Sequence, residues 1–162
     1  MREFSSLSQF GVHLATLEIA EAIALHKGLE RVAKLVENTA KNEIGFYQSA
    51  IGPFQDWAPL ADSTEEEKAR LGYATNAPLL RTGEMRDSIK HEVDGLDAII
   101  GSEDDKLVWQ EFGTNTIPPR PVLGPAAFRN KEKIEKIMGH AAVTGLIGGQ
   151  LIHEALGYDF ET

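Results

Sequence analysis

Residues 25–44 have the sequence LHKGLERVAKLVENTAKNEI, in which apolar side chains recur at steps of three and four residues. The apolar positions are Leu25, Leu29, Val32, Val36, Ala40 and Ile44. This spacing is typical of an α-helix that buries one side. The pairs Glu30–Lys34 and Glu37–Lys41 stand four residues apart with the acid first, which is the favourable order on a helix surface.

The limits of this helix follow from its flanks. Gly52-Pro53 ends it, because proline cannot continue a helix, so we predict one long helix over residues 15–51. Residues 1–14 are mixed in character, and we expect them to form a flexible arm that orders on assembly.

Residues 52–125 are predicted to form a β-containing core. Ser63-Thr64-Glu65-Glu66 has the composition of a capping box and predicts a short helix that stops near Gly72. Residues 89–93 and 96–100 are two short β candidates, and Asp94-Gly95 between them is a hairpin signal. Residues 107–112 fit a helical turn and a strand equally well.

The C-terminal part begins with an extended segment. Residues 116–125 contain four prolines and cannot form regular helix. Residues 126–157 are predicted to be helical, with an apolar side formed by Ile134, Ile137, Met138 and Ala141. Gly145, Gly148 and Gly149 allow either a break or close helix packing in its second half.

These elements predict an α+β fold in a single domain over residues 1–162. Its parts are a long N-terminal helix, a small antiparallel β-sheet with short helical turns, and a C-terminal helix packed on one face.

The composition narrows the function. The formal net charge of −9 disfavours a DNA-gripping module, because phosphate binding requires basic side chains. An acidic lumen would still let DNA pass without adhering to it. The chain has no cysteine, which excludes disulfides and thiolate chemistry. The apolar run at residues 141–152 is shorter than the roughly 20 residues that span a bilayer, so we expect a soluble protein without a membrane partner.

The sequence contains no convincing catalytic, cofactor or metal motif. The five histidines are scattered, and His153-Glu154 lacks the second histidine of a metalloprotease motif. Gly145-x-x-Gly148-Gly149 lacks the context of a nucleotide loop. We therefore expect no enzyme activity. The retained enzymatic alternative is a small hydrolase that uses His91 or His140 with a carboxylate.

Two further segments have a functional and a structural interpretation. Glu103-Asp104-Asp105 could bind a hard cation, but a solvated turn is the favoured interpretation. Pro118-Pro119-Arg120-Pro121 contains a PxxP spacing, but a stiff connector before the last helix is favoured. Trp57 and Trp109 are more typical of core or interface anchors than of ligand-stacking residues.

Five short motifs occur in order over about seventy residues. They are Trp57-Ala58-Pro59-Leu60-Ala61; Leu79-Leu80-Arg81-Thr82-Gly83-Glu84-Met85-Arg86-Asp87-Ser88-Ile89; Ile99-Ile100-Gly101-Ser102; Gln110-Glu111-Phe112-Gly113-Thr114; and Pro118-Pro119-Arg120-Pro121-Val122-Leu123-Gly124-Pro125-Ala126.

This order resembles the virion-morphogenesis, neck and tail-completion proteins of tailed bacteriophages. The group includes proteins of the minor tail protein Z type and the tail-completion proteins of Mu-like phages. The resemblance covers residues 57–128. The chain departs from the usual pattern at Val122, where an aromatic residue is common, and at Leu107-Val108, where Tyr-Ala is common.

The resemblance implies structural roles for the motif residues. They are Trp57, Pro59, Leu80, Thr82, Gly83, Arg86, Ser88, Gly101, Phe112, Gly113, Pro119, Arg120 and Pro121.

From their chemistry we expect several local roles. Thr82 should cap the turn that Gly83 begins, and Arg86 and Ser88 should tie that turn to nearby backbone. Gly101 and Gly113 suit positions with positive φ.

Arg120 lies between two prolines, which fix the direction of its guanidinium. We expect its partner to be a buried or intersubunit carboxylate, with Glu111 as the candidate.

The resemblance also implies a function. We expect a structural component of the head–tail junction that forms a ring and joins the tail to the DNA-filled head. Its partners would be portal-adaptor or stopper proteins on one side and tail terminator or tail tube proteins on the other. It would be assembled in the host cytoplasm and located in the neck of the virion. The alternative is a non-structural assembly factor for tail joining that is absent from the mature virion.

Overall fold

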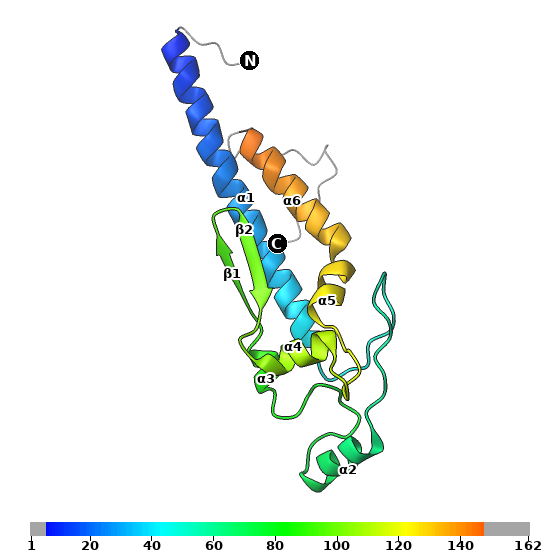
Figure 1. Cartoon of the computed structure of the whole chain (residues 1–162). Helices are drawn as coiled ribbons and strands as arrows, with labels where there is room; N and C mark the ends of the chain where they lie inside the picture. The colour runs from blue at the N-terminus through cyan, green and yellow to red at the C-terminus, as the bar shows by residue number, and fades with distance from the viewer. Residues whose placement is uncertain (1–5, 148–162) are drawn as a thin grey trace. The chain divides into compact units, whose positions relative to one another are not determined.

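The computed structural model describes residues 6–147 (Figure 1). The elements are α1 (Leu7–Glu43), α2 (Asp62–Arg70), α3 (Glu84–Asp87), β1 (Lys90–Asp94), β2 (Asp97–Gly101), α4 (Asp105–Phe112), α5 (Leu123–Arg129) and α6 (Lys131–Leu146). The strands form a two-stranded antiparallel sheet, and α6 packs against α1. The predicted α+β fold, with its long N-terminal helix, small sheet and C-terminal helix, is confirmed.

The long helix begins earlier and ends earlier than predicted. It starts at Leu7, inside the expected arm, because the Ser6 hydroxyl accepts a hydrogen bond from the Gln9 backbone N–H at 3.2 Å. A side chain in this position satisfies one of the free N–H groups of the first turn. The helix ends at Glu43, and Gly45 follows with φ of 100°. Of the predicted arm, residues 1–5 lie outside the described residues.

The chain divides into two compact units. Among the described residues, the first contains residues 6–32, 93–98 and 132–147, and the second contains residues 33–92 and 99–131. Helix α1 and the β1–β2 hairpin therefore contribute to both units. The single domain predicted over residues 1–162 stays a prediction.

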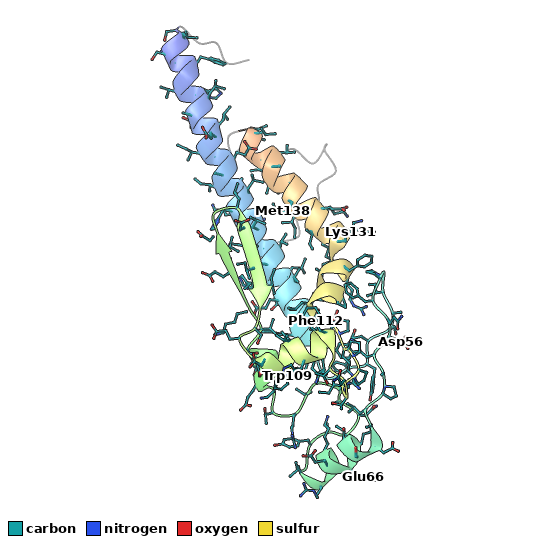
Figure 2. All side chains as sticks on the ribbon, viewed as in Figure 1. Asp56, Glu66, Trp109, Phe112, Lys131 and Met138 are labelled. Atoms are coloured by element: carbon teal, nitrogen blue, oxygen red, sulfur yellow. The ribbon has the colours of Figure 1, made fainter. Side chains whose placement is uncertain are left out.

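In the first unit, α6 lies beside the middle of α1, around Glu21 and Gly28 (Figure 1). Glycines stand where the two helices touch. A Cβ atom added at Gly28 would lie 2.8 Å from the Ala141 Cβ, and one added at Gly145 would lie 2.5 Å from the Glu21 Cα. Of the two alternatives for Gly145, the structure has close helix packing. Met138, labelled in Figure 2, borders the same contact, because its sulfur would lie 3.3 Å from a Cβ atom added at Gly28.

The hairpin turn also belongs to the first unit. Its two strands start one residue later than predicted, and Gly95 follows β1 with φ of 58°. Glycine is favoured there because an L side chain resists this backbone conformation. The His26 Nδ1 atom is 2.9 Å from the Gly95 carbonyl oxygen, so the imidazole can donate a hydrogen bond to the turn.

The second unit has an apolar core formed by the end of α1 and the following loops and helices. Its buried apolar residues are Ala33, Val36, Ala40, Ile44, Trp57, Ala77, Ile89, Leu107, Val122 and Ala126. Val36 and Ala40 belong to the apolar side of α1 predicted from the three- and four-residue spacing, whereas Ala33 was not among the predicted positions. Residues 107–112, left open between helix and strand, belong to α4, and the Asp104 side chain caps this helix by accepting from the Lys106 N–H at 2.9 Å.

Two helix boundaries differ from the predictions. The prediction of a capping box at residues 63–66 is wrong. Helix α2 begins at Asp62, and its N-cap residue Ala61 has no side-chain acceptor. Acidic Asp62 and Glu65 in the first turn favour the helix electrostatically instead.

The C-terminal helix is divided at Asn130. Its buried amide donates to the Thr39 hydroxyl and to the Ala126 carbonyl oxygen, both at 2.8 Å. Helix α5 starts at Leu123, three positions earlier than the helix predicted from residue 126, and it accommodates Pro125 in its first turn. The part of the predicted helix at residues 148–157 lies outside the described residues.

Within residues 6–147, no helix combines the length and apolar character needed to cross a bilayer.

Candidate interaction site

The first and last sequence motifs lie against each other in the second unit. Trp57 is 4% exposed, and its Nε1–H donates a hydrogen bond to the Pro121 carbonyl oxygen at 3.0 Å. Its backbone N–H donates to the Gln48 carbonyl oxygen at 3.0 Å. Trp57 is therefore a core anchor with a satisfied polar atom, which is one of the two roles that its type predicted.

Arg120 completes this contact. Its Nε and Nη2 atoms donate to the Ala58 carbonyl oxygen, and Nη2 also donates to the Pro59 carbonyl oxygen at 3.0 Å. The residue is 5% exposed, and this burial lowers the pKa of the guanidinium. The prediction that Glu111 is the partner of Arg120 is wrong. The two neighbouring prolines aim the fork at carbonyl groups of the Trp57 segment rather than at a carboxylate.

Glu111 has a different role, as a cap supplied by a neighbouring helix. Its Oε2 atom accepts from the Val122 N–H at 2.7 Å and the Leu123 N–H at 3.2 Å, and Oε1 accepts from the Gly124 N–H at 3.3 Å. The N-cap residue Val122 has no side-chain acceptor of its own. A carboxylate at this end of α5 satisfies N–H groups that lack helical partners and complements the helix dipole.

The Phe112-Gly113 motif ends α4. Gly113 has φ of 73°, as predicted, and an added Cβ would lie 2.9 Å from the Ile117 carbonyl oxygen and 3.0 Å from Pro119. Pro119 therefore packs over the glycine. The prediction for Gly101 is wrong, because this residue ends β2 and is absent from the positive-φ positions. The turn after it is stabilised by Ser102, whose hydroxyl accepts from the Asp104 N–H at 2.9 Å.

The Thr82–Ser88 motif forms the short helix α3. Gly83 is its N-cap with φ of 91°, and the Thr82 hydroxyl accepts from the Glu84 N–H at a long 3.4 Å. Ser88 donates to the Met85 carbonyl oxygen at 2.7 Å, as expected, and lies 2.6 Å from the Ser102 hydroxyl. The prediction for Arg86 is wrong, since its Nε donates to the Asp87 side chain at 2.9 Å instead of to backbone.

Leu80 belongs to a loop that surrounds a buried cation. The Lys68 ammonium donates to the Ala77 carbonyl oxygen at 2.5 Å and to the Leu80 carbonyl oxygen at 3.0 Å. Burial lowers the pKa of Lys68. Next to Leu80, Leu79 has φ of 61°, the one positive value among non-glycine residues in the described part of the chain. Residues 76–80 were expected to form a loop, but the burial of Lys68 was not predicted, because a lysine in a charged helix resembles a surface residue.

A buried polar cluster at the end of α1 was also missed. Glu43 is 5% exposed, and its Oε1 accepts from the Arg129 Nε at 2.9 Å. Arg129 also donates to the Gln48 Oε1 at 3.1 Å, and the Gln48 amide donates to the Glu43 carbonyl oxygen at 3.1 Å. Burial raises the pKa of Glu43 to about 7, although Arg129 opposes the shift. Within residues 6–147, the Glu43 Oε2 atom has no hydrogen-bond partner.

The histidines of the enzymatic alternative lie outside two open pockets of the second unit. His91 Nδ1 forms a hydrogen bond with Glu37, whose carboxylate also pairs with Lys41. Lys41 and then His91 hold the pKa of Glu37 below its usual value. Neither His91 nor His140 lines either of two open pockets in the second unit, and residues 6–147 contain no group of three or more His, Asp or Glu side chains placed to hold a metal ion.

Helix α4 carries an exposed apolar face. Val108 and Trp109 are each 50% exposed and Phe112 is 79% exposed. Together with Asp105 they stand at positions i, i+3, i+4 and i+7, which is one side of a helix. We call these four residues the α4 face. Figure 2 labels Trp109 and Phe112 on this helix. Trp109 therefore differs from Trp57, since half of its surface is open to a partner.

A second surface feature of the same unit is an open pocket of about 460 Å³. Its lining residues are Asn38, Lys41, Asn42, Ile44, Phe46 and Arg86. They come from the end of α1, the residues after it, and α3. We call this the α1–α3 pocket.

Comparison with protein-family models, curated proteins and solved structures finds no match to this chain.

Proposed function

We propose that this protein is a structural subunit of the head–tail junction of a tailed bacteriophage. In this proposal, several copies form a ring that completes the neck or tail and joins the tail to the DNA-filled head. The observation that supports it best is the contact between the first and last of the five motifs. Arg120 and Trp57 hold the two segments together through the Ala58, Pro59 and Pro121 carbonyl oxygens.

The roles of these residues in the fold are packing and hydrogen bonding, and none of these roles requires a chemical reaction. Trp57 and Arg120 are buried and bonded to backbone, Glu111 caps α5, and Gly113 allows Pro119 to pack closely. A set of residues that builds a scaffold is what a structural subunit requires. An active site would instead need polar groups that converge on open space.

The exposed apolar residues of α4 support a subunit that binds other proteins. Large aromatic side chains are enriched at protein interfaces. Within a ring, neighbouring copies would meet through a head-to-tail contact, since such contacts generate closed rings. The further partners would be portal-adaptor or stopper proteins on one side and tail terminator or tail tube proteins on the other. Because the chain is acidic, its contact with DNA would be limited to the lumen of the ring, through which the DNA would pass without adhering.

Imaging of purified phage particles by electron cryomicroscopy tests this proposal. A symmetric ring of this chain between portal and tail would support it and give the copy number. The alternative is an assembly factor that leaves after tail joining. It predicts mature particles without this chain, together with tails and heads that fail to join when the chain is deleted.

A further inference from the structure

We propose that the α4 face of one copy docks into the α1–α3 pocket of the next copy, so that these two surfaces form the ring contact. The inference rests on the proposed function, because it needs several copies of the chain to assemble. Both surfaces belong to the second unit, and they share no residue. One copy can therefore use both at once, which is the condition for a head-to-tail ring.

The apolar parts of the two surfaces match. The α4 face presents Trp109 and Phe112, and the pocket contains Ile44 and Phe46. Phe46 is 70% exposed, so the pocket side also offers an aromatic side chain for contact. Pockets of roughly 300–1,000 Å³ enclose small organic molecules, so a volume of about 460 Å³ has room for an aromatic side chain of a neighbour.

The charges also match. Asp105 begins the α4 face, and exposed Glu103 lies two residues before it. The pocket presents two cations, Lys41 and Arg86. Each cation already has an intramolecular carboxylate partner, Glu37 for Lys41 and Asp87 for Arg86, but neither carboxylate lines the pocket.

A neighbour's acidic group would therefore be a second carboxylate for Lys41 or Arg86, added to the partner that each cation already has. Lys41 and Arg86 on one pocket wall give an acidic helix end two cationic side chains to contact. The amides of Asn38 and Asn42 on the pocket rim can donate hydrogen bonds to the same carboxylates.

Cross-linking tests the contact directly, because the natural chain has no cysteine. A variant with Asn42→Cys and Val108→Cys carries one thiol at the pocket rim and one on the α4 face, and it keeps Trp109, Phe112 and Phe46. Particles that contain this variant are treated with a short bis-maleimide reagent. We expect a ladder of dimers, trimers and larger covalent oligomers, because every copy is joined to both neighbours.

Controls separate this contact from others. Each single-cysteine variant can give dimers at most. A matched pair, Glu66→Cys with Val108→Cys, replaces the pocket thiol by an exposed position on α2 that belongs to neither surface (Figure 2). If the chain is present in the particles and only this matched pair gives a ladder, or no pair does, the proposed contact is wrong while the structural function stands. If the chain is absent from the particles, both proposals are wrong.

Charge reversal provides an independent readout that does not depend on a reagent. Glu103→Lys with Asp105→Lys should reduce incorporation into particles about tenfold, because like charges then face each other. Adding Lys41→Glu and Arg86→Glu to the same chain should restore incorporation to within about twofold of the natural chain. Circular dichroism confirms that each variant is folded. If the combined variant incorporates no better than the first one, the charge match is refuted.

Discussion

The guanidinium of Arg120 and the carbonyl oxygen of Ala58 are joined by two hydrogen bonds, from Nε at 3.1 Å and from Nη2 at 3.0 Å. The two residues stand 62 positions apart in the sequence. This pair connects the proline-rich segment to the Trp57 segment, and it supplies acceptors for the buried guanidinium. A guanidinium supplies several donors in a fixed plane, so lysine cannot reproduce the arrangement.

Replacing this arginine should therefore destabilise the fold. We expect Arg120→Lys to lower the free energy of unfolding by about 2–4 kcal/mol, because a buried charge keeps fewer hydrogen bonds and a carbonyl group loses its donor. Urea denaturation followed by circular dichroism measures the change. The matched control is Arg81→Lys, an exposed arginine paired with Glu67, for which we expect less than about 1 kcal/mol. Equal effects at the two positions would contradict the buried role of Arg120.

The two tryptophans allow a similar comparison. Trp57→Phe keeps most of the aromatic ring but removes the Nε1–H that binds the Pro121 carbonyl oxygen. We expect a loss of roughly 1–3 kcal/mol in unfolding free energy, since a partly buried acceptor is left unpaired. Trp109→Phe should change stability by less than about 0.5 kcal/mol, because half of Trp109 is exposed. Thermal and urea unfolding of both variants check this order, and a reversed order would refute it.

Glu43 should make stability depend on pH. Its pKa rises from 4.5 to about 7 in the folded protein, because burial disfavours the carboxylate. Folding therefore favours the protonated form. The associated stability is fully present below pH 4.5 and is lost as the pH rises through 7, with an upper bound of roughly 3 kcal/mol.

Glu43→Gln removes this titration. We expect the difference in unfolding free energy between pH 5 and pH 8 to shrink in this variant, measured by urea denaturation at both values. Glu67→Gln is the control, since Glu67 is about half exposed. The assignment to Glu43 would not survive if the Glu43→Gln variant kept the full pH difference of the natural protein.

The glycines between α1 and α6 should tolerate no side chain. Gly145→Ala would place a Cβ atom 2.5 Å from the Glu21 Cα, so the helices must move apart, and we expect a loss of about 1–3 kcal/mol. Gly11→Ala in the same α1 helix meets no atom within 4 Å and should stabilise the protein by about 0.5–1 kcal/mol, because alanine favours helix. The melting temperatures of the two variants should therefore shift in opposite directions.

The fold class could be predicted from the sequence because its signals are local. The three- and four-residue spacing of Val32, Val36, Ala40 and Ile44 depends on nothing outside α1, and these residues are buried as expected. The hairpin likewise follows from the glycine at position 95. The division of the C-terminal helix at Asn130 could not be predicted in this way, because the Asn130 amide binds Thr39, 91 positions earlier in the chain.

The candidate site was predicted less completely. The motif residues were found, but their partners depend on which side of a helix faces which segment. Glu111 lies near Arg120 in sequence, yet its carboxylate points to the start of α5. The Glu43–Arg129 pair spans 86 positions, and no spacing pattern identifies such a pair. The exposure of Phe112 and Trp109 is also a property of the folded chain. All three of Leu107, Trp109 and Phe112 are apolar, so the sequence alone does not say which of them the rest of the protein covers.

The two glycine contacts between α1 and α6 also determine how these helices are aligned lengthwise. Gly28 faces Ala141 and Gly145 faces Glu21, so the helices run in opposite directions with two small residues as fixed points. Sliding α6 by one turn, about 5.4 Å, in the direction that brings Ile137 opposite Gly28 would place a larger side chain where Ala141 now lies. The two close contacts therefore oppose slippage of α6 in that direction, so they help to fix the alignment of the two helices.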